Sequence, residues 1–310
     1  MTNKVVKDMK LRENMTIKQF IDELGKCGGF MSLSLVKGVK IVKNMFLDED
    51  CTVFLSFTAN LVATGLRSVF ADLVKRRLVD VIITTGGSID HDIIKAYGGK
   101  YYVGSFEAND IKLHRENINR LGNIYVPNEN YGLLEKVLQG ILLEIYEEKK
   151  TVSIRELIYE IGRRMKPDEN SFVYQAAKNN VPIFSPGFQD SALGLQVFLF
   201  NQEHELVVDA TKDMKELADI VYDSKKTGAI ILGGGISKHY TIASNLLRGG
   251  LDYAVQITTA QPYDGSLSGA RLNEAISWGK VKEEGIISTI QGDATIIFPL
   301  LIAAVYSQLP

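Results

Sequence analysis

The segment Glu274–Lys280, EAISWGK, brings together a carboxylate, the only tryptophan of the chain and a lysine. A lysine amine that has lost its proton can attack an imine or a carbonyl and form a covalent Schiff base. The face of Trp278 suits a cationic ligand, and Glu274 precedes it by one helical turn on the same face. The segment therefore predicts either an amine-binding site with Lys280 as nucleophile, or a plain helix with Trp278 packed inward and Lys280 at its C-terminus.

His239 is the second candidate for chemistry, because it follows the three glycines of GGGISKHY at the predicted start of a helix. The positive end of a helix dipole disfavours a protonated imidazole, so this position predicts a neutral base. His91 also lies in a predicted strand-end loop, whereas His114 and His204 lie in polar stretches typical of a surface. The spacing HDIIKAYGG fits no metal site, and no nucleophile elbow indicates a Ser-His-Asp triad.

Three glycine-containing loops could hold a phosphate, because glycine lets backbone amides approach an anion at a helix N-terminus. They contain Gly86–Gly87, Gly233–Gly235, and Gly265 with Gly269. None reads G-x-G-x-x-G, since Lys238 stands where the last glycine would be, and the P-loop motif of nucleotide hydrolases is missing. Tight turns also need glycine, so the loops together favour a nucleotide without separating NAD from ATP.

Along the chain one pattern repeats: a short apolar run, then small residues, then a helical pattern. Most of the candidate residues lie after the apolar run of such a repeat. The repeated pattern appears at 52–77, 79–98, 228–250 and 252–280. Apolar strands that alternate with helices predict a doubly wound, Rossmann-like α/β fold, with a mostly parallel sheet and helices on both faces. Ligands of such sheets bind beyond the carboxyl ends of the strands. We expect a single domain over 1–310, with a further helical stretch near 134–165.

The composition excludes several classes of protein. A net charge of −2 and a pI near 6.1 give no sign of binding to nucleic acid or anionic membranes. Two cysteines, Cys27 and Cys51, suggest a reducing compartment rather than a disulfide framework. The start of the chain has no apolar signal core, and the run Ala294–Tyr306 is too short to span a bilayer. We expect a cytoplasmic protein with a buried C-terminal helix.

Several longer segments resemble the deoxyhypusine synthase family. The resemblance runs from about Thr52 to Phe298 and points to an archaeal or prokaryotic-type member. It is carried by FTANLVATG, TTGGSIDHD, HRENINRLGNIYVPNENY, IFSPGFQDSALG and SKHYTIASNLLRGGLDYAVQITTAQPYDGSLSGARLNEAISWGK.

The resemblance implies an NAD-dependent transferase that moves the aminobutyl group of spermidine to a lysine of translation factor 5A. It implies that an enzyme lysine carries this group as an imine, and Lys280 in SWGK matches that lysine. It implies that His239 lies at the substrate amine, and that substrate is bound by Asp90, His91, Gly265, Ser266, Glu274 and Trp278. It implies cofactor positions at Ala59, Asn60, Leu61, Val62, Ala63, Thr85, Gly86, Gly87, Asp190, Gly234, Thr259, Ala260, Asp293 and Ala294.

Three departures from the family pattern concern the amine donor. Leu267 in DGSLSGA and Leu195 in LGLQ stand where many members have Asp, and Asp90–His91 replaces a pair of glutamates. These changes remove negative charge from a site for a polyamine, whose desolvated charges need partners. The donor is therefore either spermidine held differently or a less charged amine such as agmatine. A homospermidine-synthase-like enzyme on the same scaffold is a further alternative, and an NAD-binding scaffold without turnover is the alternative outside enzymes.

The resemblance also implies a homotetramer with active sites at subunit interfaces. The charged leader, residues 1–14, is then a candidate for a mobile arm that covers a neighbour's site, or simply a frayed terminus.

Overall fold

The computed structural model describes residues 5–310, which form two compact units. One unit comprises the chain up to Ser56 together with Ile220–Pro310, and the other comprises Phe57–Asp219. We refer to them as the terminal unit and the central unit. The expectation of a single domain stays a prediction.

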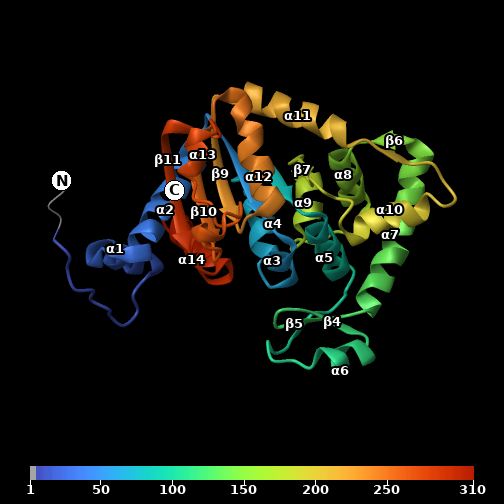
Figure 1. Cartoon of the computed structure of the whole chain (residues 1–310), viewed down its shortest axis with the longest axis horizontal. Helices are drawn as coiled ribbons and strands as arrows, with labels where there is room; N and C mark the ends of the chain where they lie inside the picture. The colour runs from blue at the N-terminus through green and yellow to red at the C-terminus, as the bar shows by residue number, and fades with distance from the viewer. Residues whose placement is uncertain (1–4) are drawn as a thin grey trace. The chain divides into compact units, whose positions relative to one another are not determined.

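The terminal unit contains four parallel strands in the order β11-β10-β9-β1 (Figure 1). These strands are β1 (Cys51–Phe57), β9 (Lys226–Leu232), β10 (Leu251–Thr258) and β11 (Val281–Gln291). Its helices are α1 (Ile17–Cys27), α2 (Phe30–Leu47), α12 (Gly235–Ser244), α13 (Glu274–Ser277) and α14 (Ala294–Tyr306), with short 3₁₀ turns at Asn245–Arg248 and Pro262–Asp264. Helix α11 (Ala210–Asp223) runs from the central unit into this one.

Helices and loops cover both faces of the terminal sheet. Gly38 of α2 lies against Val255 of β10 and Ile290 of β11, which point to one face. Gln256 and Thr289, on the opposite face, hydrogen-bond to the backbone of the segment that leads into α13. The alternation of strand side chains thus places α2 below the sheet and the 266–280 segment above it. The prediction of a mostly parallel α/β fold with helices on both faces is confirmed.

The central unit has a parallel pair, β2 (Val81–Thr84) with β7 (Ile183–Phe184), and two smaller sheets. The smaller sheets pair β3 (Tyr102–Val103), β4 (Ile118–Leu121) and β5 (Ile124–Pro127), and β6 (Thr151–Val152) with β8 (Val207–Val208). Its helices are α3 (Ala59–Ala63), α4 (Arg67–Lys75), α5 (Gly86–Ala96), α6 (Asp110–Arg115), α7 (Glu129–Glu148), α8 (Ile154–Arg164), α9 (Phe172–Asn179) and α10 (Ala192–Phe200).

Aromatic rings fill the core of the central unit. Phe57 stacks on Phe70 with ring centroids 4.1 Å apart, and Phe172 meets Phe57 edge-on at 5.3 Å. All three side chains are fully buried. Such pairs contribute about 1 kcal/mol each beyond the apolar area that they bury.

The helical stretch expected near 134–165 is interrupted, which corrects the prediction. α7 ends at Glu148, Thr151–Val152 pairs with β8, and the Ser153 hydroxyl then accepts from the Glu156 amide to cap α8. The capping serine and the β-branched pair before it favour a break over a continuous helix. The C-terminal helix is confirmed as α14, which begins at an Asp293 cap and contains Pro299, but it is only partly buried, since Ile296 is 67 % exposed.

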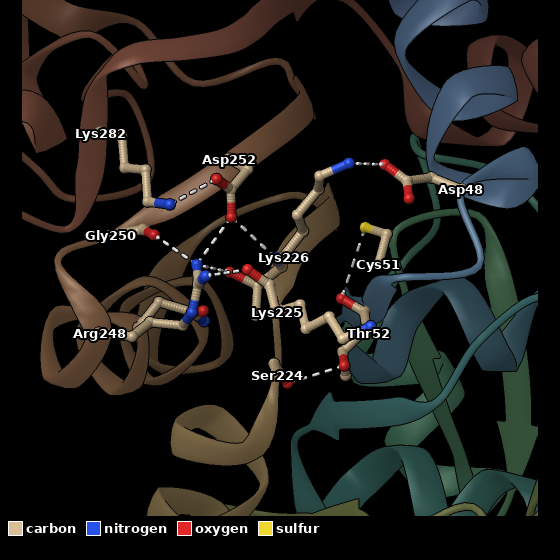
Figure 2. A network of polar contacts seen from close by, with 12 residues as sticks. Asp48, Cys51, Thr52, Ser224, Lys225, Lys226, Arg248, Gly250, Asp252 and Lys282 are labelled. Atoms are coloured by element: carbon tan, nitrogen blue, oxygen red, sulfur yellow. Dashed lines mark hydrogen bonds and ion pairs between the residues drawn. The ribbon is translucent and has the colours of Figure 1, made fainter.

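The amino ends of the terminal strands are tied together by ion pairs, as Figure 2 shows. The Asp252 carboxylate accepts from Lys282 at 2.5 Å, from Arg248 at 2.7 Å and from the Thr227 amide at 2.9 Å. Lys226 at the start of β9 pairs with Asp48 at 2.7 Å. We call Asp252, Arg248 and Lys282 the amino-end network.

The charged leader lies partly outside the described residues, which exclude 1–4. Within the part that is described, the Lys7 amide donates to the Lys26 carbonyl at 3.2 Å, and the Lys10 amide donates to Glu23 at 3.1 Å. These contacts tie the leader to α1 of the same unit. A role as a mobile arm stays a prediction.

Candidate active site

A pocket of about 350 Å³ in the terminal unit collects most of the residues singled out for chemistry. Its walls include Lys280, His239, Trp278, Glu274 and Gly265. They come from α12, from the loop after β10, and from the segment that runs from α13 into β11. Residues that are distant in sequence therefore share one cavity, at one face of the parallel strands.

Lys280 occupies the turn between α13 and β11. α13 is a single turn that ends at Ser277, shorter than the predicted helix, because Gly279 has a φ of 66° and redirects the chain. The Lys280 amide donates to the Ala275 carbonyl at 2.9 Å, and its carbonyl accepts from the Leu251 amide at 3.1 Å. The backbone of Lys280 is thus fixed from both sides while its side chain extends into the pocket.

The Lys280 amine faces an imidazole and an indole. Its Nζ lies 3.2 Å from His239 Nε2 and 5.1 Å from the centroid of the Trp278 ring. Partial burial, together with the nearby Lys280, lowers the pKa of His239. A neutral His239 can accept a hydrogen bond or a proton from the amine through Nε2. The lowered pKa is consistent with the neutral base predicted for His239. Its causes are burial and Lys280, rather than the helix start from which it was predicted.

Trp278 is 70 % exposed, so its indole forms an open wall rather than part of a packed core. The inward-packed tryptophan of the plain-helix alternative does not occur. In this structure Lys280 itself lies over the ring, and the exposed part of the indole is accessible to a second cation. Glu274 accepts from the Arg271 amide at 3.2 Å and otherwise faces the pocket.

Lys238 is a pocket residue whose role the sequence did not reveal. It is 1 % exposed, and its Nζ donates to the carbonyls of Leu267 at 2.8 Å and Ala270 at 2.5 Å. Burial lowers the pKa of Lys238 to about 8, against the opposing effect of Glu274. Lys238 thereby holds the 265–270 loop over the pocket. The only signal in the sequence was a lysine where a glycine fingerprint would end.

Leu267 lines the same pocket, so the missing carboxylate at that position does bear on this cavity. Among the described residues of the pocket wall, Glu274 is the one acid, while Lys238, His239, Arg271 and Lys280 are bases. Ser266 adjoins Gly265, but its side chain is not part of the wall. Its amide donates to Asp264 and its carbonyl accepts from Gly269.

Asp90 and His91 are buried inside the central unit, at 3 % and 6 % exposure. Asp90 accepts from the amides of Ala192 and Leu193 at 2.9 Å each, so it caps the start of α10. Burial raises the pKa of Asp90 to about 7, although these two hydrogen bonds oppose the shift. Burial lowers the pKa of His91 to about 4, and its Nδ1 lies 2.7 Å from the Tyr101 hydroxyl. Their proposed contact with substrate stays a prediction.

Leu195 is 52 % exposed on α10 and lines a cavity of about 540 Å³ in the central unit, beside Asp190 and Tyr131. Leu195 and Leu267 therefore belong to different cavities, one in each unit.

The cofactor positions of the central unit gather at one place. Ala59–Ala63 forms α3, and Thr85–Gly87 begins α5, where Gly87 lies against Ala59. Gly86 lies against Ser191, next to Asp190, so a side chain at Gly86 would clash. Lys95 holds α3 by donating to the carbonyls of Val62, Ala63 and Thr64 at 2.6–2.8 Å, a contact that the sequence did not indicate.

The cofactor positions of the terminal unit lie at the carboxyl ends of its strands. Gly234 follows β9, Thr259–Ala260 follows β10, and Asp293–Ala294 follows β11. The Gln291 side-chain amide bridges two of these ends, donating to the carbonyls of Thr259 at 3.3 Å and Ala260 at 2.7 Å.

Each unit has a helix start that suits an anionic group such as a phosphate. α5 and α12 both begin without a side-chain cap, so their first amides remain available to a phosphate. Gly233 and Gly235 have φ values of 84° and 66°, and Gly234 has no room for a Cβ beside Ser268. Only glycine permits this path of the backbone at a helix start.

No helix among residues 5–310 combines the length and the apolar character needed to cross a membrane. Within the same residues, no group of three or more His, Cys, Asp or Glu side chains is arranged to hold a metal ion.

Comparison with known proteins points to one family. The profile of the deoxyhypusine synthase family matches residues 19–305. A probable deoxyhypusine synthase of Picrophilus torridus is 49% identical over 96% of each chain, and one of Thermoplasma volcanium is 50% identical over 97% of each chain. A crystal structure of a putative deoxyhypusine synthase from Entamoeba histolytica covers 97% of each chain with a TM-score of 0.69 and 22% identity, which supports the fold.

The match extends over nearly the whole chain, in sequence and in fold. This chain is therefore a transferase and belongs to the deoxyhypusine synthase family.

Proposed function

We propose that this chain uses NAD to transfer the 4-aminobutyl group of spermidine to a lysine of translation factor 5A, with Lys280 as the carrier. The observation that carries the proposal is the contact between the Lys280 amine and His239, 3.2 Å apart in a pocket with Trp278 and Glu274. An amine with a neutral base beside it, and without a carboxylate bound to it, can become a nucleophile.

When bound, NAD would supply hydride chemistry, as oxidant of a carbon bonded to a donor nitrogen and as NADH in the reduction of the product imine. Gly234, Thr259, Ala260, Asp293 and Ala294 would hold it in the terminal unit. Ala59–Ala63, Thr85–Gly87 and Asp190 are the corresponding positions in the central unit. The uncapped starts of α5 and α12 support this assignment.

The residues of the pocket carry the group transfer. His239 accepts a proton from Lys280, whose free amine adds to the imine carbon of the oxidised donor. The bond from that carbon to the leaving nitrogen breaks, the diamine departs with a proton, and the butyl group stays on Lys280 as an imine. The acceptor lysine then adds to the same carbon and releases Lys280. Glu274 and Trp278 bind the amine end of the group, and Lys238 keeps the 265–270 loop in place.

A second function is favoured by the charges of the pocket. Lys238, His239, Arg271 and Lys280 face a single acid, Glu274, among the described residues of the wall. A polyamine with three charges gains little from such a wall, whereas a donor with fewer charges loses less on desolvation. Agmatine as donor, or a small amine as acceptor in a homospermidine-synthase-like reaction, fits this balance on the same scaffold.

One experiment separates these functions. The protein is incubated with NAD and ¹⁴C-labelled spermidine or agmatine, with and without the factor, and products are resolved by mass. Spermidine-derived label on one lysine of the factor supports the first proposal. Label from agmatine, or label in a small amine, supports the second. If no donor labels any acceptor, both proposals are wrong.

We further propose a cytoplasmic homotetramer, on the strength of the family resemblance. Light scattering of the purified protein tests the assembly. A monomeric mass at micromolar concentration contradicts it.

A further inference from the structure

Helix α2 begins with an aromatic residue in an unusual conformation. Phe30 has a φ of 43°, in the left-handed region that a bulky side chain rarely adopts, and its side chain is 98 % exposed. Both features are unfavourable, because the left-handed backbone is strained and an apolar ring in water gains nothing from burial. Strain of this kind points to a functional role when the surroundings enforce it.

The surroundings do enforce it. Gly28 closes α1 in a left-handed conformation, with its amide donating to the Leu24 carbonyl at 3.2 Å. The Ser32 hydroxyl then accepts from the Gly29 amide at 3.2 Å and donates to the Gly29 carbonyl at 2.5 Å. The turn is therefore fixed on both sides of Phe30. The ring of Phe30 projects into solvent because this fixed turn directs it there.

Phe30 also lies where a parallel sheet binds its ligands. The sulfur of the next residue, Met31, accepts from the Gln291 amide at 3.2 Å, at the last position of β11. The Gln291 side chain in turn donates to Thr259 and Ala260, just beyond β10. The Ser288 hydroxyl donates to the Ser34 carbonyl at 2.9 Å and fixes the first turn of α2 to β11. Ligands of such sheets bind at these carboxyl ends.

We propose that Phe30 is a stacking platform for the adenine ring of the dinucleotide. This rests on the cofactor assigned under the proposed function. An exposed ring held rigidly beside the strand ends suits a flat heteroaromatic ring, which gains by stacking on it.

The strand register indicates which end of the dinucleotide reaches Phe30. Val281, next to Lys280, pairs with Leu251, whereas Gln291, next to Met31, pairs with Thr258. The two ends of β10 are roughly 23 Å apart at the usual rise per residue. A bound nicotinamide would lie near the carbon that Lys280 attacks, so the ring that would reach Phe30, at the other end of the strands, is the adenine.

The test compares dissociation constants of the whole protein for NAD, ADP-ribose and nicotinamide mononucleotide by calorimetry. Phe30→Ala should weaken NAD and ADP-ribose about tenfold and leave nicotinamide mononucleotide unchanged. Phe30→Trp keeps an aromatic ring at this position and should bind NAD as tightly as the unmodified protein. Phe30→Gly should weaken NAD as Phe30→Ala does, yet raise the melting temperature, because glycine adopts the left-handed conformation without strain.

Arg77→Gly is the matched control. Arg77 is exposed in the central unit and has a φ of 56°. Its replacement should raise the melting temperature and leave all three dissociation constants unchanged.

Three results would overturn the inference. One is an NAD affinity of Phe30→Ala equal to that of the unmodified protein. Another is a smaller assembly of Phe30→Ala in light scattering, which would assign Phe30 to contact with a second copy. The third is a raised KM for the protein acceptor alone. An unmodified protein that binds no NAD would refute the proposed function itself, and the inference with it.

Discussion

Two lysines two positions apart, Lys280 and Lys282, are held in opposite ways. Lys282 donates to the Asp252 carboxylate at 2.5 Å, inside a network that Arg248 and the Thr227 amide complete (Figure 2). Lys280 has no carboxylate within salt-bridge distance among residues 5–310, and its amine meets only an imidazole and an indole face. One ammonium is therefore neutralised in place, while the other amine is positioned and left available.

The difference shows how one strand serves two purposes. The amino-end network anchors β10 and β11 through charges, and the Leu251 amide donates to the Lys280 carbonyl at the same end. A rigid backbone under Lys280 keeps its amine at His239 without engaging it in an ion pair. Preorganisation of this kind depends on a region whose charges are all paired, next to an amine that has no ion pair.

Replacing the two lysines one at a time should give the largest difference in the rate of transfer. Lys280→Ala should lower the rate of transfer by roughly 10³-fold or more, because the carrier of the group is lost. Lys282→Ala should keep most of the transfer activity and lower the melting temperature, because Asp252 loses a partner. Initial rates and thermal unfolding of the two variants check this. Similar activities in both variants would contradict the assignment.

Removing the base should have the next largest effect. His239→Ala should slow transfer by about 10²-fold, at the lower end for a proton acceptor. Since the pKa of His239 is lowered, the neutral imidazole prevails at pH 7, and the rate should fall only as pH drops below the ordinary histidine range. His239→Gln should lose that acidic limb of the pH profile. A profile with the same limb in both proteins would assign it to another group.

Asp252→Asn should act on stability more than on chemistry. Burial alone would raise the pKa of Asp252, but hydrogen bonds from Lys282, Thr227 and Arg248 lower it overall. Its stabilising contribution is present above the unfolded pKa of about 3.9 and is lost as pH falls through the lower folded value. The variant should lose roughly 2 kcal/mol of unfolding free energy at pH 7 and show a weaker acid dependence. Urea unfolding at several pH values measures both.

The smallest effect should come from the open wall of the pocket. Trp278→Leu keeps an apolar side chain and removes the aromatic face, a change worth about 1 kcal/mol for a bound cation. The KM of the amine donor should rise about fivefold with little change in kcat. A lower kcat with unchanged KM would show that Trp278 positions Lys280 instead.

The fold was largely predictable because its signals are local. Apolar runs followed by glycine, as in residues 79–98 and 228–250, gave β2 with α5 and β9 with α12. Strand β11 was not predicted, because the polar residues Lys282–Gly285 interrupt its apolar pattern. They lie where the pairing with β10 shifts register, between Val281 and Ile286. The broken helix near 149–153 depended on pairing with β8, which lies far along the chain.

The pocket was predictable where its residues adjoin one another, as Glu274, Trp278 and Lys280 do. Lys238 could not be assigned, because its role depends on two carbonyls about 30 positions away. A place for Asp90 at the substrate stays a prediction, but its hydrogen bond to the start of α10, 102 residues later in the chain, could not be predicted. Long-range hydrogen bonds of this kind leave no periodicity in a sequence.

The most direct test of the account is reductive trapping on Lys280. The protein is mixed with NAD and a labelled donor, treated with borohydride and mapped by peptide mass. The account predicts an added aminobutyl group on Lys280, in quantities that depend on NAD, and no adduct on Lys238 or Lys282. An adduct on either of those lysines, or transfer to the acceptor without any adduct on Lys280, would contradict it.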